Sequence, residues 1–384
     1  MEALTPASLH GRRRPWEDLP SELLGLVLLR IPSHASRVRL RAVCRSWRAG
    51  AHMQSPLPPL LPWLALRDGS FLSLPDGEVH RRILTSDDDV AHRVSTGSML
   101  FLVHSHEGCS LMDPLSREST APRHVDLKVL RTRPGALLDV ENIRKVVVVS
   151  DQVTAVRAGN NLTISVCRPR SFNLVWRWLS PFDTYCDYIL DIAFFQEKLY
   201  VLTTIPVGTY PLCLYAVDII RDKTINIPCV FTTSKDDVDR WAAHHLPHYL
   251  VESGERLLMV KQNWRTGIEV QFDKQAGPAL FEVYEATDMS NSGGGRWRKI
   301  DTLMGHALFL SEGCSKSLPS AGHGCVGAQD DCIYFLSERY NQRVRRLYSG
   351  IYNMKDGTTS PLPFDMEAAH DGPLTTNWFF PEDM

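Results

Sequence analysis

A short all-α segment followed by a long, mostly antiparallel all-β domain is the fold class that the sequence predicts. Helical spacing of apolar residues is concentrated between residues 16 and 52. A proline-rich stretch, SPLPPLLPW, comes next. Beyond Trp63, short β-rich runs alternate with turn residues over the rest of the sequence.

The first helix is predicted from one broad apolar face. Leu19-Pro20 opens it, because proline suits the first turn of a helix, where its missing N–H costs nothing. Pro32 ends it after Ile31. The apolar positions between these prolines recur at helical spacing, and they are Leu23, Leu24, Val27, Leu28 and Ile31.

A second helix is expected after Ser33, which suits a helix N-cap. Its apolar residues divide between two sides, with Val38, Ala42 and Val43 on one and Leu40, Cys44 and Trp47 on the other. The two helices together form a hairpin with more apolar surface than it can bury alone, which favours a docking role. The alternative is an ordinary amphipathic hairpin packed on its own domain.

The two half-motifs LPSELLGLVLLRIP and RVRLRAVCRSWR resemble an F-box, the short helical module that docks onto the Skp-type adaptor of cullin ubiquitin ligases. Many relatives carry an acid where Ser36 stands, so a polar contact at the start of the second helix is missing or weaker here. The resemblance implies adaptor binding by Leu19, Pro20, Leu23, Leu24, Val27, Ile31, Val43, Cys44 and Trp47.

The composition gives no sign of a nucleic-acid or membrane partner, and it favours a reducing compartment. Lys and Arg number 42 against 44 Asp and Glu, so nothing calls for a nucleic acid or an acidic membrane surface. The nine cysteines form no CxxC pair, which favours the reducing cytoplasm or nucleus over an oxidising compartment. No apolar run is long enough to suggest a membrane span.

Four segments follow from these patterns. Residues 1–14 are small, polar and basic and are expected to be flexible. Residues 15–52 form the F-box, and residues 53–62 form a semi-rigid connector because four prolines exclude helix there. Residues 63–384 form the β domain.

The β domain shows a loose internal repeat. The segments FFQEKLYVLTT, LVESGERLLMVKQ and GAQDDCIYFLS share a strand–turn–strand theme at an irregular spacing of about fifty residues, near the range of propeller blades. Each small antiparallel unit needs a neighbour to cover its faces, and radial closure supplies one while hiding sheet edges. We therefore predict a β-propeller of six or seven blades. A sandwich or open barrel is the alternative, and it leaves the repeat unexplained.

The same region resembles a class of plant F-box proteins whose C-terminal part is a kelch-like β-propeller domain of unknown function. The resemblance covers nearly the whole chain, and its most specific part runs from His306 to Phe335. It implies that the last strand, from Trp378 to Phe380, closes the ring against early strands.

Motifs for catalysis or metal binding are mostly missing. The sequence has no GxSxG elbow and no phosphate loop. His244, His245 and His248 form an HHxxH pattern, but no Cys or Glu lies at a spacing that completes a zinc site, so we expect no metal and no cofactor. Cys314, in SEGCS, is expected to pack between blades rather than act as a nucleophile.

The sequence thus predicts a non-catalytic substrate-recognition subunit of an SCF-type (Skp–cullin–F-box) ubiquitin ligase. The F-box would dock on the Skp-type adaptor and through it on a cullin, and the propeller would bind a protein substrate for ubiquitination. Two alternatives stay open: a protein-binding scaffold that works without the ligase, and a propeller-based enzyme. Neither the substrate nor the residues that bind it are predicted.

Overall fold

The computed structural model describes most of the chain outside its long loops. The described residues are 16–54, 57, 59–66, 69–74, 77–80, 90–104, 108–116, 143–150, 153–158, 163–167, 174–177, 188–204, 212–217, 229–232, 247–264, 279–289, 295–320, 327–341, 344–363 and 376–382. The segment 1–14, expected to be flexible, lies outside them. Among the described residues, no helix has the length and apolar character that a membrane crossing needs.

The N-terminal module contains three α-helices instead of the predicted two. A 3-10 turn, η1 (Trp16–Asp18), precedes α1 (Ser21–Leu28), α2 (His34–Arg41) and α3 (Arg45–His52). The predicted second helix is interrupted at Cys44, whose backbone is extended at φ −156° and ψ 172°. The Cys44 Sγ accepts a hydrogen bond of 3.4 Å from the Trp47 N–H, so Cys44 is the N-cap of a separate helix.

The ends of the first two helices follow local signals only in part. Ser33 caps α2 as predicted, because its side chain accepts a hydrogen bond of 3.4 Å from the Ser36 N–H. The helix α1 ends at Leu28, before the predicted end at Ile31. The Ile31 carbonyl instead accepts a hydrogen bond of 2.9 Å from the Nε of Arg37, a fully buried side chain of α2.

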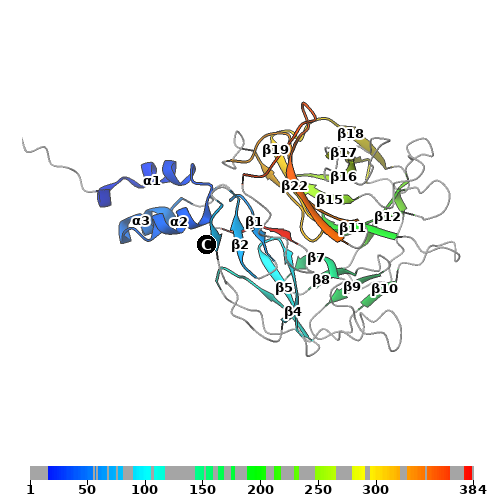
Figure 1. Ribbon diagram of the computed structural model, residues 1–384. Coiled ribbons are helices and arrows are strands. Elements are labelled where there is room, and N and C mark those ends of the chain that lie inside the picture. Colours follow the sequence, from blue (N-terminus) through cyan, green and yellow to red (C-terminus); the bar gives the residue numbers. More distant parts are fainter. Residues whose placement is uncertain are drawn as a thin grey trace, which may run out of the picture.

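Twenty-four strands in the described part of the chain form six sheets, numbered I to VI in chain order (Figure 1). Sheet I contains β24 (Asn377–Phe379), β1 (Trp63–Ala65), β2 (Phe71–Ser73) and β3 (Val79–His80), and sheet II contains β4 (Val90–Thr96), β5 (Met99–His104) and β6 (Gly108–Met112). Sheet III contains β7 (Ile143–Ser150), β8 (Val153–Ala158), β9 (Thr163–Cys167) and β10 (Leu174–Arg177).

The remaining sheets come from the second half of the β domain. Sheet IV contains β11 (Tyr188–Phe195), β12 (Lys198–Thr204), β13 (Leu212–Val217) and β14 (Cys229–Thr232), and sheet V contains β15 (His248–Ser253), β16 (Arg256–Trp264), β17 (Ala279–Thr287) and β18 (Arg296–Ile300). Sheet VI has the order β20 (Lys316–Pro319), β19 (His306–Leu310), β21 (Cys332–Asn341), β22 (Val344–Asn353) and β23 (Thr359–Ser360).

One edge strand of each sheet contacts its counterpart in the next sheet. The contacts run from β24 to β4, then to β7, β11, β15 and β20. This radial order is that of a β-propeller, so the predicted fold class is confirmed. Five sheets have the four or five strands of a full blade, and sheet II has three among the described residues. The predicted count of six is reached only if sheet II is counted as a blade.

The last strand closes the ring, as the resemblance implied. Strand β24 pairs antiparallel with β1, and Leu64 lies opposite Trp378. Trp378 is fully buried, and its Nε1 donates a hydrogen bond of 3.0 Å to the Leu310 carbonyl of sheet VI. Sheet I is therefore built from both ends of the β domain.

Buried apolar clusters fill all six interfaces between neighbouring sheets, including the one between sheets VI and I that closure creates. This distribution is expected of a ring, because every sheet must cover both faces. One residue from each of the two sheets at an interface serves as an example. Starting between sheets I and II and following the ring, the pairs are Trp63 with Leu100, Phe101 with Val146, Ile164 with Ile192, Leu202 with Leu257, Val251 with Leu308, and Phe309 with Leu64.

The helical module is docked on sheet I, which lies beside it in Figure 1. Arg39 of α2 forms an ion pair of 2.6 Å with Glu78, just before β3. His34 of α2 meets Trp63 of β1 edge to face, with ring centroids 5.6 Å apart. In the connector, Leu57 packs on the helices and Leu61 packs in the propeller core.

Replacing Trp378 by alanine should destabilise the propeller. The substitution removes a fully buried indole from the closing strand, and such a change costs about 3–5 kcal/mol. We expect the midpoint of thermal unfolding, followed by the β-sheet circular dichroism signal, to fall clearly. Trp16→Ala is the matched control, since Trp16 is 78% exposed. Equal midpoints for the two variants would show that the ring does not depend on this strand.

Candidate functional site

The helical module has a small core of its own. Leu24 and Leu28 of α1 are buried together with Leu40 of α2 and Ala51 of α3. Leu24 is only 1% exposed and packs inside the module, and its contact with an adaptor stays a prediction. The physical reason for its burial is the third helix: α3 covers the side of α1 that a two-helix hairpin leaves open.

Three further predicted adaptor residues also pack against this core. Leu19, Ile31 and Trp47 are partly buried on it, and the Trp47 Nε1 donates a hydrogen bond of 2.8 Å to the Trp16 carbonyl. Cys44 is partly buried as the N-cap of α3. These residues hold the module together and reach its surface only in part.

An apolar stripe on α1 remains uncovered. Leu23 and Val27 are 49% and 44% exposed, and Pro20 before them is also exposed. Leu26, which the sequence analysis did not select, is 49% exposed. Positions 23, 26 and 27 follow position 20 by three, six and seven residues, so the four share one broad face of the helix. This helical spacing in the sequence is the signal that would have placed Leu26 on the same face as Leu23 and Val27. We call these four residues the α1 stripe.

Other apolar side chains are exposed on the same module. Val43, predicted to contact the adaptor, is 60% exposed in the segment between α2 and α3. The others carry no predicted adaptor contact, and they are Trp16, Leu29, Val38 and Met53. A module of three short helices with this much uncovered apolar surface is a candidate interaction site.

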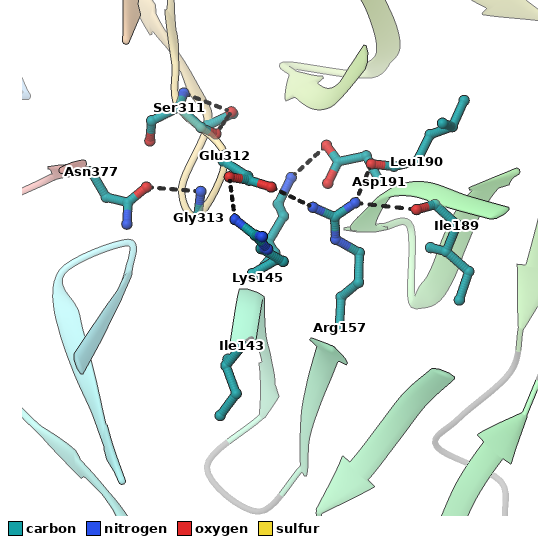
Figure 2. A network of polar contacts seen from close by, with 12 residues as sticks. Ile143, Lys145, Arg157, Ile189, Leu190, Asp191, Ser311, Glu312, Gly313 and Asn377 are labelled. Atoms are coloured by element: carbon teal, nitrogen blue, oxygen red, sulfur yellow. Dashed lines mark hydrogen bonds and ion pairs between the residues drawn. The ribbon is translucent and has the colours of Figure 1, made fainter. Parts of the chain in front are cut away.

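A second candidate site lies at the centre of the propeller, where the sequence analysis predicted nothing (Figure 2). Lys145 of β7 forms an ion pair of 2.7 Å with Asp191 of β11, and both side chains are almost fully buried. The same carboxylate oxygen accepts a hydrogen bond of 2.7 Å from the Leu250 N–H of β15. Asp191 thus connects three neighbouring sheets.

Next to this pair, two arginines share a second carboxylate. Arg157 of β8 donates to the backbone carbonyls of Ile189 and Leu190, and its Nη2 lies 3.5 Å from a carboxylate oxygen of Glu312. Arg144 of β7 reaches the other oxygen of Glu312 at 3.2 Å. These contacts need the strand registers of a folded ring, so residue spacing in the sequence gives no sign of them.

Glu312 belongs to the short loop between β19 and β20, which is tied to the closing strand. The Gly313 N–H donates a hydrogen bond of 2.8 Å to the Asn377 side chain, and the Trp378 N–H donates one of 3.2 Å to the Ser311 hydroxyl. A Cβ at Gly313 would lie 2.7 Å from the Asn377 amide, so a larger residue here would displace the Asn377 side chain.

Chemical activity at Cys314 is disfavoured by its surroundings. The side chain is 6% exposed, and its sulfur accepts a hydrogen bond of 3.3 Å from the Gly97 N–H. Burial raises the pKa of the thiol, although the Gly97 contact and two lysines act in the opposite direction. Across the ranges that the structure describes, no group of three or more His, Cys, Asp or Glu side chains is placed to hold a metal ion. His244 and His245 lie outside those ranges.

Comparison with known protein families gives two matches. The family described as KIB1-4 beta-propeller matches residues 71–353, and the family described as F-box-like matches residues 16–54. The first match covers most of the chain, and the second covers the helical module.

Individual relatives match over shorter segments. The chain is 33% identical to the F-box protein SKIP23 of Arabidopsis thaliana over 119 residues, which are 29% of this chain and 26% of SKIP23. Another Arabidopsis thaliana F-box protein is 50% identical over 36 residues, 9% of each chain. The matched segments therefore span about a quarter or less of the relatives' own lengths.

Solved structures resemble the chain only distantly. The N-terminal domain of Nup159 has a TM-score of 0.28 at 10% identity and covers 74% of this chain and 67% of its own. The α-L-arabinofuranosidase Arb93A of Fusarium graminearum has a TM-score of 0.32 at 6% identity, covering 72% of this chain and 96% of its own. Scores this low carry no inference about function.

Cys314 should resist alkylation in the folded protein. Burial raises the pKa of the Cys314 thiol, which lowers its thiolate fraction, and burial also restricts access to the sulfur, so we expect iodoacetamide to label Cys314 at least about ten times more slowly than the partly buried Cys44. Peptide mass spectrometry over a labelling time course measures both rates, and unfolding in urea should make them similar. Faster labelling of Cys314 than of Cys44 would indicate an activated thiol and revive the enzyme alternative.

Proposed function

Because the chain belongs to the family of KIB1-4 β-propeller proteins and carries an F-box-like domain, we propose that it is a substrate receptor of an SCF-type ubiquitin ligase. In this role the helical module binds a Skp-type adaptor and, through it, a cullin. The propeller binds the protein to be ubiquitinated. The chain itself catalyses nothing, since ubiquitin transfer belongs to other subunits of such ligases.

The α1 stripe is the observation that carries this proposal. Leu23, Leu26 and Val27 are about half exposed although the module has a core into which other leucines fit. Apolar side chains that stay in water on a packed helix are the anchors of helix-in-groove recognition. Burial against a partner stabilises such a complex by about 0.8 kcal/mol for each CH2 group removed from water.

The docking of the module on sheet I supports the same role. A receptor must hold its substrate at a fixed distance from the adaptor. The Arg39–Glu78 ion pair, the His34–Trp63 contact, the partly buried Leu57 and the buried Leu61 hold the module against the propeller. A protein bound to the propeller would therefore have a defined position relative to the adaptor.

The decisive test is adaptor binding by the double variant Leu23→Ala/Val27→Ala. Both side chains are about half exposed, so truncation should leave the module folded and weaken binding by about 2 kcal/mol, which is about thirtyfold in Kd. Biolayer interferometry with a purified Skp-type adaptor measures the change. A Leu19→Ala/Pro20→Ala variant is less suitable, because Leu19 also packs on the module core.

The control for this test is Val79→Ala/Met304→Ala. It removes two exposed apolar side chains, 48% and 63% exposed, from the propeller. This variant should bind the adaptor like the wild type. Undiminished binding by Leu23→Ala/Val27→Ala would show that the α1 stripe is not part of the adaptor interface. A wild type that is folded and does not bind the adaptor would favour the scaffold alternative.

A further inference from the structure

Of the two arginines at the centre of the propeller, Arg157 is held in place independently of its carboxylate partner. The Arg157 side chain is 6% exposed, and two backbone carbonyls of β11, those of Ile189 and Leu190, fix its guanidinium. Its Nε has no hydrogen-bond acceptor among the residues that the structure describes. A buried cation that is positioned by backbone and has donor capacity left is organised in advance for an anion.

The carboxylate shared by these arginines is held loosely. Charge-assisted hydrogen bonds between guanidinium and carboxylate groups are typically about 2.7–2.9 Å long. Glu312 lies 3.2 Å from Arg144 and 3.5 Å from Arg157, whereas the neighbouring Lys145–Asp191 pair is at 2.7 Å. Asp191 is thus the strongly bound carboxylate of the network, and Glu312 is the weakly bound one.

Solvent reaches the weak pair and not the strong one. The side chains of Glu312 and Arg144 are 38% and 20% exposed, whereas those of Lys145 and Asp191 are 6% and 3% exposed. Figure 2 shows the carboxylate of Glu312 on the side of Arg157 opposite Ile189. Within the described part of the chain, these ion pairs join three cations, Arg144, Lys145 and Arg157, to two carboxylates. The accessible end of the network is therefore the one with the arginines and the loosely held carboxylate.

We propose that Arg144 and Arg157 form a binding site for a carboxylate of an acidic peptide segment, and that Glu312 occupies this site in the unbound protein. An incoming Asp or Glu side chain replaces or joins Glu312, and closer bonds to the two guanidinium groups favour the exchange. The site deepens the receptor role proposed above, on which it rests, by assigning an acidic segment to the substrate that the propeller holds.

The test is fluorescence anisotropy of a fluorescein-labelled hexaglutamate peptide with the full chain. Arg144→Gln should weaken binding at least about fivefold, because it removes one charged donor. Glu312→Gln should strengthen binding at least about fivefold, because it removes the competing carboxylate. Arg157 is left unchanged, since its guanidinium also donates to two backbone carbonyls, those of Ile189 and Leu190.

Matched controls come from an ion pair on the outer strands of sheet V, Arg298 with Glu285 at 2.7 Å. Arg298→Gln and Glu285→Gln change the net charge as the test variants do, so they report non-specific attraction of the peptide. Both should stay within about twofold of the wild type, and a neutral hexaglutamine peptide should not bind.

Three results would overturn the site: no hexaglutamate binding by the wild type or by Glu312→Gln, equal effects of Arg144→Gln and Arg298→Gln, or equal effects of Glu312→Gln and Glu285→Gln. Circular dichroism establishes that each variant is folded. The adaptor is not part of this assay, so the failure of the acidic site and the failure of adaptor binding are separate outcomes.

Discussion

Antiparallel pairing of β24 with β1 is the contact on which most of this structure depends. It completes sheet I, and sheet I covers one face of sheet II and one face of sheet VI. The same strand anchors the β19–β20 loop through Asn377 and Trp378, and that loop carries Glu312 to the centre of the ring. The helical module also rests on this sheet, since Trp63 and Glu78 belong to it or adjoin it. One pairing therefore supports the ring, the central network and the position of the module.

Trp63 shows how closely these parts are joined. Its ring lies 5.6 Å from that of His34 in α2, 4.6 Å from that of His80 and 6.1 Å from that of Phe379 in the closing strand. A single buried side chain thus contacts the helical module, the β2–β3 side of its own sheet and the C-terminal strand. Aromatic contacts of this kind add to area burial, so the module and the ring reinforce each other at one place.

Local sequence signals predicted the local features of the fold well. Ser33 capped a helix as expected. The closing strand around Trp378 was implied by the family resemblance rather than by local signals, and it pairs with β1. The missed features depend on tertiary structure. Whether Leu24 or Leu23 faces outward is decided by α3, which a two-helix interpretation did not contain. The central network joins β7, β8, β11 and the β19–β20 loop, and no periodicity within one strand predicts which side chains meet across a ring.

Closure by the first and last strands of the ring also has a kinetic consequence. The two strands are far apart in the sequence, so forming this contact has a high entropic cost of loop closure. It belongs to the slow, non-local class of folding events. Until β24 arrives, β1 has an unpaired edge, and unpaired edges are sites of misassembly. The β domain is therefore most exposed to aggregation late in folding, after the intermediate sheets have formed and before the ring is complete.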